Sequence, residues 1–191
     1  MNRTFLLAGA AALALTLAAC GKPAETTDVA AAPDANPTAT VPTPADESAA
    51  PDFVAKAATS DLFEIASSKV ALERTKNAEV KAFAQMMIEM HTQTTADLKS
   101  AITDSGLVLT PPTVLPEDKA EDVAELRTAE AADFDKDYLD DQVDGHQATL
   151  DLMTRYAQDG DNAVLKAAAA KTAPIVQDHL TKAKALRDGL S

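Results

Sequence analysis

Apolar side chains recur every three or four residues through most of the chain after residue 52, and this spacing restricts the fold to helices. No stretch in this part of the sequence alternates apolar and polar residues over the length of a strand. Helix-breaking and capping residues divide it into expected helices at 52–74, 77–106, 117–127, 131–158 and 161–188. The sequence therefore predicts an all-α fold, a bundle of four long helices with an extra short helix in the crossover.

Single residues set several of these boundaries. Asn77 is expected to cap the second helix, and Gly106 is expected to end it. Asp161 is expected to cap the last helix. Pro174 lies inside that helix, where it removes one backbone hydrogen bond, so we expect a kink or a local widening.

The first twenty residues have the three parts of a secretory signal. Arg3 precedes an apolar stretch at 5–17, and small residues follow it. The tetrapeptide Leu17-Ala18-Ala19-Cys20 resembles the bacterial lipobox, in which the cysteine receives a diacylglyceryl group and becomes the first residue of the mature protein. We therefore expect a lipoprotein signal peptide at 1–19 and a covalent lipid on Cys20. An ordinary leader with a chance cysteine is the alternative.

The lipid predicts the location of the protein. Several acyl chains hold a protein stably at a membrane, because each buried methylene contributes about 0.8 kcal/mol. Gly21 stands where an Asp would signal retention in the inner membrane, so we expect an outer-membrane lipoprotein that faces the periplasm. Residues 20–51 are rich in Ala, Pro and Thr and predict a disordered tether, which leaves 52–191 as one helical domain.

Charge and composition exclude several functions. The formal net charge of −13 argues against binding to nucleic acid. The sequence has one cysteine, no Gly-x-Ser-x-Gly elbow, no phosphate-binding glycine loop and no Ser-x-x-Lys motif, so it carries no signature of nucleophilic catalysis. These absences indicate a binding or structural role, with a protein of the cell envelope as a partner, rather than an enzyme.

The three histidines of the chain, His91, His146 and His179, fall on the inward faces of three different helices. Each lies within about five residues of the middle of its helix, or about 7 Å at the helical rise, so the imidazoles are expected to converge at one level. Asp61 and Glu64 lie beside the middle of the first helix, at the same level. Histidines and a carboxylate at one level of a bundle are a candidate metal site.

Two alternative roles for these histidines stay open. Neutral histidines can instead form a buried hydrogen-bonded network with a carboxylate and with Thr92, Thr94 and Thr95. Several methionines lie near the histidine faces and would suit monovalent copper, although methionines at helical spacing usually serve packing. The Glu-x-x-His pattern of dinuclear ferritin-like sites is absent, because Ile88, Val143 and Val176 stand three residues before the histidines.

Gly145 costs its helix about 1 kcal/mol relative to alanine, so we expect it to permit a close approach of a neighbouring helix, with a ligand pocket as the alternative.

The helical part of the chain resembles a bacterial family, the domain of unknown function 4142. The motifs that carry the resemblance are Phe63-Glu64-Ile65, Asn77 to Ala84, Met87, His91-Thr92, Phe134-Asp135, Tyr138, His146-Gln147, Leu165-Lys166 and Pro174 to Leu180. The resemblance implies a ferritin-like helical bundle in exported, outer-membrane proteins without an assigned reaction. It also implies that Glu64, His91, His146 and His179 match recurring polar residues. Relatives typically carry Asp before the first two histidines, where this chain has Met90 and Gly145.

Together these features lead to two functional hypotheses. The first is a lipoprotein anchored to the envelope membrane, with a non-catalytic helical domain that binds a partner or supports the envelope. The second is a metal-binding ferritin-like protein that holds a transition metal at His91, His146, His179 and Glu64.

Overall fold

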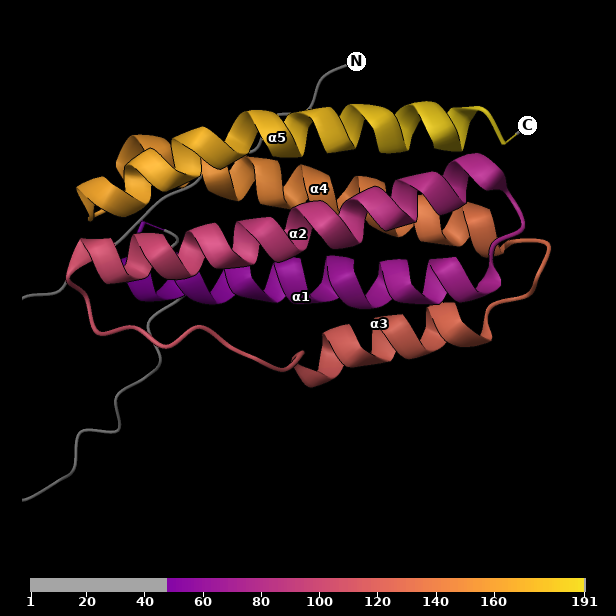
Figure 1. The fold of residues 1–191 in the computed structure, drawn as a ribbon, viewed down its shortest axis with the longest axis horizontal. Coiled ribbons are helices and arrows are strands. Elements are labelled where there is room, and N and C mark those ends of the chain that lie inside the picture. Colours follow the sequence, from indigo (N-terminus) through magenta and orange to yellow (C-terminus); the bar gives the residue numbers. More distant parts are fainter. Residues whose placement is uncertain (1–47, 191) are drawn as a thin grey trace, which may run out of the picture. The chain divides into compact units, whose positions relative to one another are not determined.

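The computed structural model describes residues 48–190, so the predicted signal peptide, Cys20 and most of the predicted tether lie outside the described residues. Its helices are α1 (Ala50–Arg74), α2 (Ala78–Ser105), α3 (Glu117–Thr128), α4 (Phe134–Asp159) and α5 (Ala163–Asp188), as Figure 1 shows. No strand occurs in these residues, which confirms the all-α prediction. None of the helices in residues 48–190 is both long enough and apolar enough to cross a membrane. α5 continues as a helix through Pro174.

The predicted caps of α2 are confirmed. The Asn77 side chain accepts hydrogen bonds from the backbone N–H groups of Glu79 and Val80, at 2.9 and 3.3 Å. These bonds satisfy donors of the first helical turn, which have no partner inside the helix. Gly106 follows the helix in the left-handed conformation, with φ 72°, which a glycine adopts without a steric penalty.

The predicted cap of α5 is wrong by one residue. The Asn162 side chain, and not that of Asp161, accepts from two backbone N–H groups in the first turn. Asp161 instead accepts from the backbone N–H of Ala50, 3.0 Å away, and from the Tyr156 hydroxyl, 2.9 Å away. Asp and Asn are almost equally good caps, so the sequence alone could not choose between neighbours. Asp161 therefore ties the start of α1 to the end of α4.

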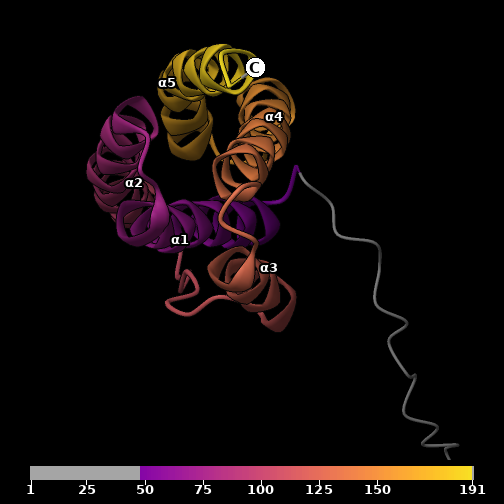
Figure 2. The same cartoon turned by 90° about the vertical axis from the view of Figure 1, so that its right-hand side faces the viewer.

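The four long helices form a bundle in which each helix is antiparallel to its two neighbours. Seen end on, the order around the bundle is α1, α2, α5 and α4 (Figure 2). The direction of α4 against α1 follows from two hydroxyl pairs, Ser68 with Tyr138 and Ser60 with Thr149, both at 2.8 Å. The long connection with α3 returns the chain along α1, so that α4 starts where α1 ends.

α3 lies outside the ring and packs on α1 (Figure 2). The Arg74 guanidinium at the end of α1 donates to the backbone carbonyls of Leu126 and Ala129, at 2.7 and 2.6 Å. The same guanidinium lies over the Phe134 ring, 4.6 Å from its centroid. One side chain thus holds the end of the crossover and the start of α4.

The core has two apolar clusters with buried polar side chains between them. One cluster surrounds Phe53 and Tyr156, whose rings stack at 3.9 Å, and the other surrounds Phe83 and Tyr138. We call the buried polar residues between the clusters the polar layer: Asp61, Glu64, Ser67, His91, Gln142, His146, Thr149 and His179. Burial of such groups is unfavourable unless hydrogen bonds or ligands compensate for lost hydration, so the polar layer is the first place to look for a function.

Candidate metal centre

The three histidines meet in the polar layer, as the sequence predicted. α2 contributes His91, α4 contributes His146 and α5 contributes His179, and the exposed fractions of the three residues are 3%, 1% and 5%. The centroids of their rings lie 5.4, 5.5 and 5.4 Å apart, which is close to an equilateral triangle. One possible ligand nitrogen from each ring lies within 4.8 Å of the other two.

Asp61 on α1 orients the ring of His91. The carboxylate oxygen Oδ1 accepts from Nδ1 of His91 at 2.9 Å and from the Thr94 hydroxyl at 2.8 Å. The second oxygen accepts from the Thr95 hydroxyl at 2.9 Å. Because a carboxylate accepts, Nδ1 carries the proton, and Nε2 of neutral His91 offers its lone pair. The network predicted around Thr94 and Thr95 is therefore present, whereas the Thr92 hydroxyl donates to the carbonyl of Ile88.

A backbone carbonyl orients His146 in the same way. Nδ1 of His146 donates to the carbonyl oxygen of Gln142, one helical turn earlier, at 2.7 Å. The lone pair of the neutral ring is again on Nε2. Sequence analysis missed this contribution of Gln142, because every helical residue has a carbonyl four positions earlier.

Each histidine has one buried ring nitrogen without a hydrogen-bond partner in residues 48–190. These atoms are Nε2 of His91, Nε2 of His146 and Nδ1 of His179. A buried polar atom that is left unpaired costs about 1–3 kcal/mol, and native structures rarely retain such atoms without a reason. Three in one layer, on converging rings, indicate a ligand that accepts lone pairs.

The environment keeps two of these rings neutral. Burial, together with the charge of a protonated His91, lowers the pKa of His146 to about 3. The same causes lower the pKa of His179 to about 4. Neutral imidazole is the form that binds metal ions, so protons do not compete for these nitrogens at neutral pH.

The triangle is somewhat wider than a loaded metal site. Nitrogens that bind Zn²⁺ tetrahedrally at about 2.0–2.1 Å lie about 3.3–3.4 Å from one another. The three histidine nitrogens lie within 4.8 Å of one another, so each pair must move closer by at most about 1.5 Å to bind one ion. Three nitrogens leave the fourth tetrahedral position open for a further ligand.

Glu64, the fourth predicted ligand, lies on the other side of His146. Its Oε1 is 3.5 Å from Nδ1 of His146, which is the nitrogen already bound to Gln142. The group of three ligand nitrogens does not include it. Burial raises the pKa of Glu64 to about 7, and its Oε2 has no hydrogen-bond partner in the described chain. In this arrangement Glu64 faces the Nδ1 side of the His146 ring, opposite the unpaired Nε2.

Gly145 makes room for Glu64. A Cβ atom at position 145 would lie 3.0 Å from Oε1 of Glu64, closer than an ordinary van der Waals contact. The glycine before His146 therefore allows a close approach between α4 and a side chain of α1. Gly145 and Glu64 also line a pocket, which is the alternative role considered for this glycine.

Two of the methionines considered as copper ligands belong to the apolar core. Met87 packs in the cluster around Phe83, and Met153 packs in the cluster around Tyr156. Both are therefore accounted for by packing. The lone pairs that converge in the polar layer come from imidazoles.

The comparisons with known proteins identify the family. A family model described as Domain of unknown function (DUF4142) matches residues 35–186, which include all of the polar layer. The chain belongs to this family. The match confirms the resemblance drawn from the sequence. Searches of curated proteins and of solved structures found no match for this DUF4142 protein.

Proposed function

We propose that this DUF4142 protein binds one transition-metal ion through His91, His146 and His179. The observation that carries the proposal is the set of three buried, unpaired ring nitrogens on converging histidines. Asp61 and the Gln142 carbonyl hold two of the rings by their other nitrogen. This is the arrangement in which metal-binding histidines are usually fixed, since the outer hydrogen bond sets the tautomer and the ring orientation.

A purely structural network accounts for less of the polar layer. Such a network would satisfy its own members, and it does so for Asp61, which accepts three hydrogen bonds. It leaves the histidine nitrogens that point away from Asp61 and Gln142 without partners. A metal ion uses those lone pairs.

The donor set favours a borderline divalent ion. Three neutral imidazoles without a thiolate suit zinc, copper, nickel or iron, and three histidines with one open position are a common zinc arrangement. We therefore take Zn²⁺ as the first ion to test. In this proposal Glu64 lies outside the ligand sphere and adjoins His146.

Elemental analysis of the full-length chain, extracted in detergent and offered zinc, tests the proposal. We expect about one zinc ion per chain, which a chelator removes. Replacement of all three histidines by glutamine should abolish binding. Thr92→Val, next to His91 but bonded to its own helix, is the matched control and should retain the metal. Equal metal content in the triple variant and the control would contradict the proposal.

We further propose that the protein is a lipoprotein of the cell envelope. Support comes from the tetrapeptide that ends in Cys20, the secretory features before it and the Pro-rich segment after it. In this role the lipid on Cys20 anchors the domain at the outer membrane on its periplasmic side. The domain acts there by binding a metal rather than by catalysis. An envelope protein is its expected partner.

Mass spectrometry of the protein from membranes tests the lipid anchor. The expected product begins at Cys20 and carries acyl chains. Cys20→Ser should abolish acylation and release the chain from the membrane fraction. A chain that remains membrane-bound and unmodified would contradict this part of the proposal without affecting the metal site.

A further inference from the structure

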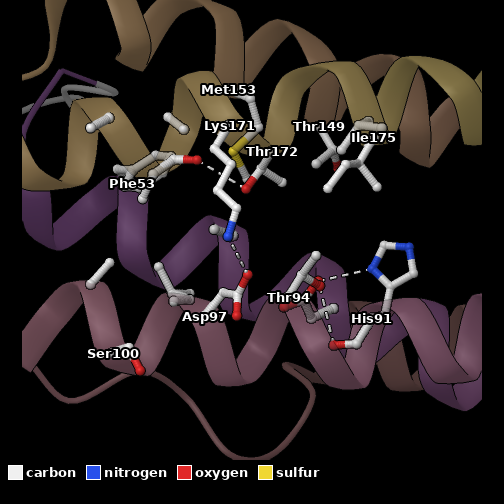
Figure 3. Close-up of a pocket in the computed structure, with 18 of the residues that line it drawn as sticks. Phe53, His91, Thr94, Asp97, Ser100, Thr149, Met153, Lys171, Thr172 and Ile175 are labelled. Atoms are coloured by element: carbon white, nitrogen blue, oxygen red, sulfur yellow. Dashed lines mark hydrogen bonds and ion pairs between the residues drawn. The ribbon is translucent and has the colours of Figure 1, made fainter.

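A cavity of about 320 Å³ lies against the histidine cluster, between α2 and α5 and over α1 and α4. Figure 3 shows His91, Thr94 and Ile175 toward one end of this cavity, Met153 near its middle and Phe53 toward the other end. His179 lines it as well, so two of the three proposed ligands border the space. The open coordination position of the metal can therefore face this cavity.

The walls of the cavity are mainly apolar. Carbon atoms of Ala57, Leu98, Ala101, Met153, Ala168 and Val176 line it. The polar groups at its inner end are already engaged: Asp61 accepts three hydrogen bonds, and the Thr94 hydroxyl donates to Asp61. A ligand in the cavity would thus meet apolar surface along its body and find one strong polar partner, the metal, at its inner end.

An ion pair crosses the opening of the cavity. Lys171 on α5 lies 3.1 Å from Asp97 on α2, and the two side chains are 72% and 43% exposed (Figure 3). Exposed ion pairs contribute little to stability, so this contact opens at small cost. The entrance therefore has a charged rim that can part, and the interior is apolar.

We propose that this cavity binds a small, largely apolar molecule with one anionic oxygen group, which completes the coordination of the metal held by the histidines. This inference rests on the proposed metal function. A divalent ion among three neutral imidazoles retains its positive charge, and the nearest fully bonded carboxylate, Asp61, offsets only part of it. An anionic oxygen at the open position is therefore the complementary ligand.

The volume sets the size of the apolar part. A cavity of about 150 Å³ accommodates benzene, so about 320 Å³ accommodates a body of up to roughly twice that size. The chemical class is thus a small aromatic or branched carboxylate or phenolate. An anion without an apolar body, such as acetate, would reach the metal but leave the cavity walls unused.

The test uses the full chain in detergent, loaded with Co²⁺, whose visible absorption reports ligands at the metal. The probes are benzoate, acetate and benzyl alcohol, which separate the contributions of the anionic group and of the ring. We expect benzoate to bind at least tenfold more tightly than acetate and more tightly than benzyl alcohol. Equal affinity for benzoate and acetate would overturn the inference.

Two positions of the same helix give a matched pair of variants. Ala168→Leu fills the cavity, whereas Ala170→Leu places the same side chain on the exposed face of α5. Benzoate affinity should fall to the level of acetate in Ala168→Leu and stay unchanged in Ala170→Leu. Acetate affinity should be the same in both. If Ala168→Leu does not fold, Thr172→Leu, one turn further along the same wall, takes its place.

The outcomes separate this inference from the metal proposal. If the protein does not take up Co²⁺, no absorption band develops and the metal function itself fails. If Co²⁺ and acetate bind but benzoate binds no more tightly than acetate, only the assignment of the cavity is contradicted. Unchanged benzoate affinity in Ala168→Leu, or in Thr172→Leu where that variant takes its place, would also overturn it.

Discussion

Oδ1 of Asp61 lies 2.9 Å from Nδ1 of His91, and this contact connects α1 to the histidine cluster. α1 provides none of the three converging nitrogens. Its contribution is to orient one ring and to place negative charge behind it. The carboxylate is held in turn by Thr94 and Thr95, so the direction of the His91 lone pair is fixed by two successive sets of hydrogen bonds.

Asp61→Asn should lower metal affinity about 10–100-fold, which is the usual effect of changing the outer partner of a histidine ligand. The amide oxygen can still accept from His91, so the fold should persist while the negative charge is lost. Competition with a chromogenic chelator measures the affinity. Asp118→Asn, an exposed residue of α3 with the same change of charge, is the control and should bind as the parent does. Equal affinities in the two variants would contradict the role of Asp61.

Metal should stabilise the folded protein by an amount that rises with the logarithm of the metal concentration above the Kd. A ligand at one hundred times its Kd adds about 2.7 kcal/mol, which corresponds to a rise in Tm of several degrees for a domain of this size. Thermal unfolding with and without zinc measures the shift, and a chelator should reverse it. His179→Gln should remove the zinc-dependent shift, because it removes one of three ligands. A shift of the same size in that variant would mean that zinc stabilises the chain elsewhere.

The sequence predicted the helices and the convergence of the histidines because both follow from a single period. Once α2, α4 and α5 are helical, the spacing of His91, His146 and His179 from neighbouring apolar residues places them inside. The helix ends then set the middle of each helix, and the distance of each histidine from that middle predicts their common depth. The ferritin-like relationship remains a prediction, which the helical fold alone does not test.

The separate roles of Asp61 and Glu64 could not be predicted. The two residues are three positions apart on α1, and both were expected near the histidines. Side-chain direction decides that Asp61 meets His91 from one side and that Glu64 meets Nδ1 of His146 from the other. That choice depends on the packing of α1 between α2 and α4, which includes the space left by Gly145. The cavity between α2 and α5 is likewise a result of how the helices pack, and no local sequence pattern predicts it.

In the metal-free protein, His146 and His179 should lower the free energy of unfolding as the pH falls from about 6.5. His146 and His179 have folded-state pKa values of about 3 and about 4, below the usual 6.5, so between these limits the unfolded state binds more protons. Glu64 and Asp141 act in the opposite direction, because burial raises their pKa values to about 7 and about 6 and the folded state takes up their protons first. The two histidines and the two carboxyl groups nearly offset each other near pH 5.5, so these four groups should give the parent protein little pH dependence of stability there.

Glu64→Gln uncovers part of the histidine contribution to this pH dependence. The variant removes one of the two opposing groups, so the free energy of unfolding should fall more steeply with decreasing pH than in the parent protein, by about 1.4 kcal/mol per pH unit near pH 5.5. Urea denaturation between pH 7 and pH 5, with chelator present, measures both slopes. Glu79→Gln, at an exposed position in the first turn of α2, controls for the loss of a carboxylate. If the free energy of unfolding changed with pH as little as in the parent protein, Glu64 would not take up a proton on folding in this pH range.

Gly145→Ala should reveal the contact between α4 and Glu64. Alanine normally stabilises a helix interior by about 1 kcal/mol relative to glycine. Here its Cβ would lie 3.0 Å from Oε1 of Glu64, a side chain that is 1% exposed and would have to shift by a few tenths of an ångström. The gain should therefore be lost in the parent protein and should reappear when Glu64 is also replaced by alanine. Urea denaturation of the two single variants and the double variant measures the coupling between these positions. Gains of equal size in both backgrounds would contradict the close contact and would leave Gly145 as a position of ordinary helix propensity.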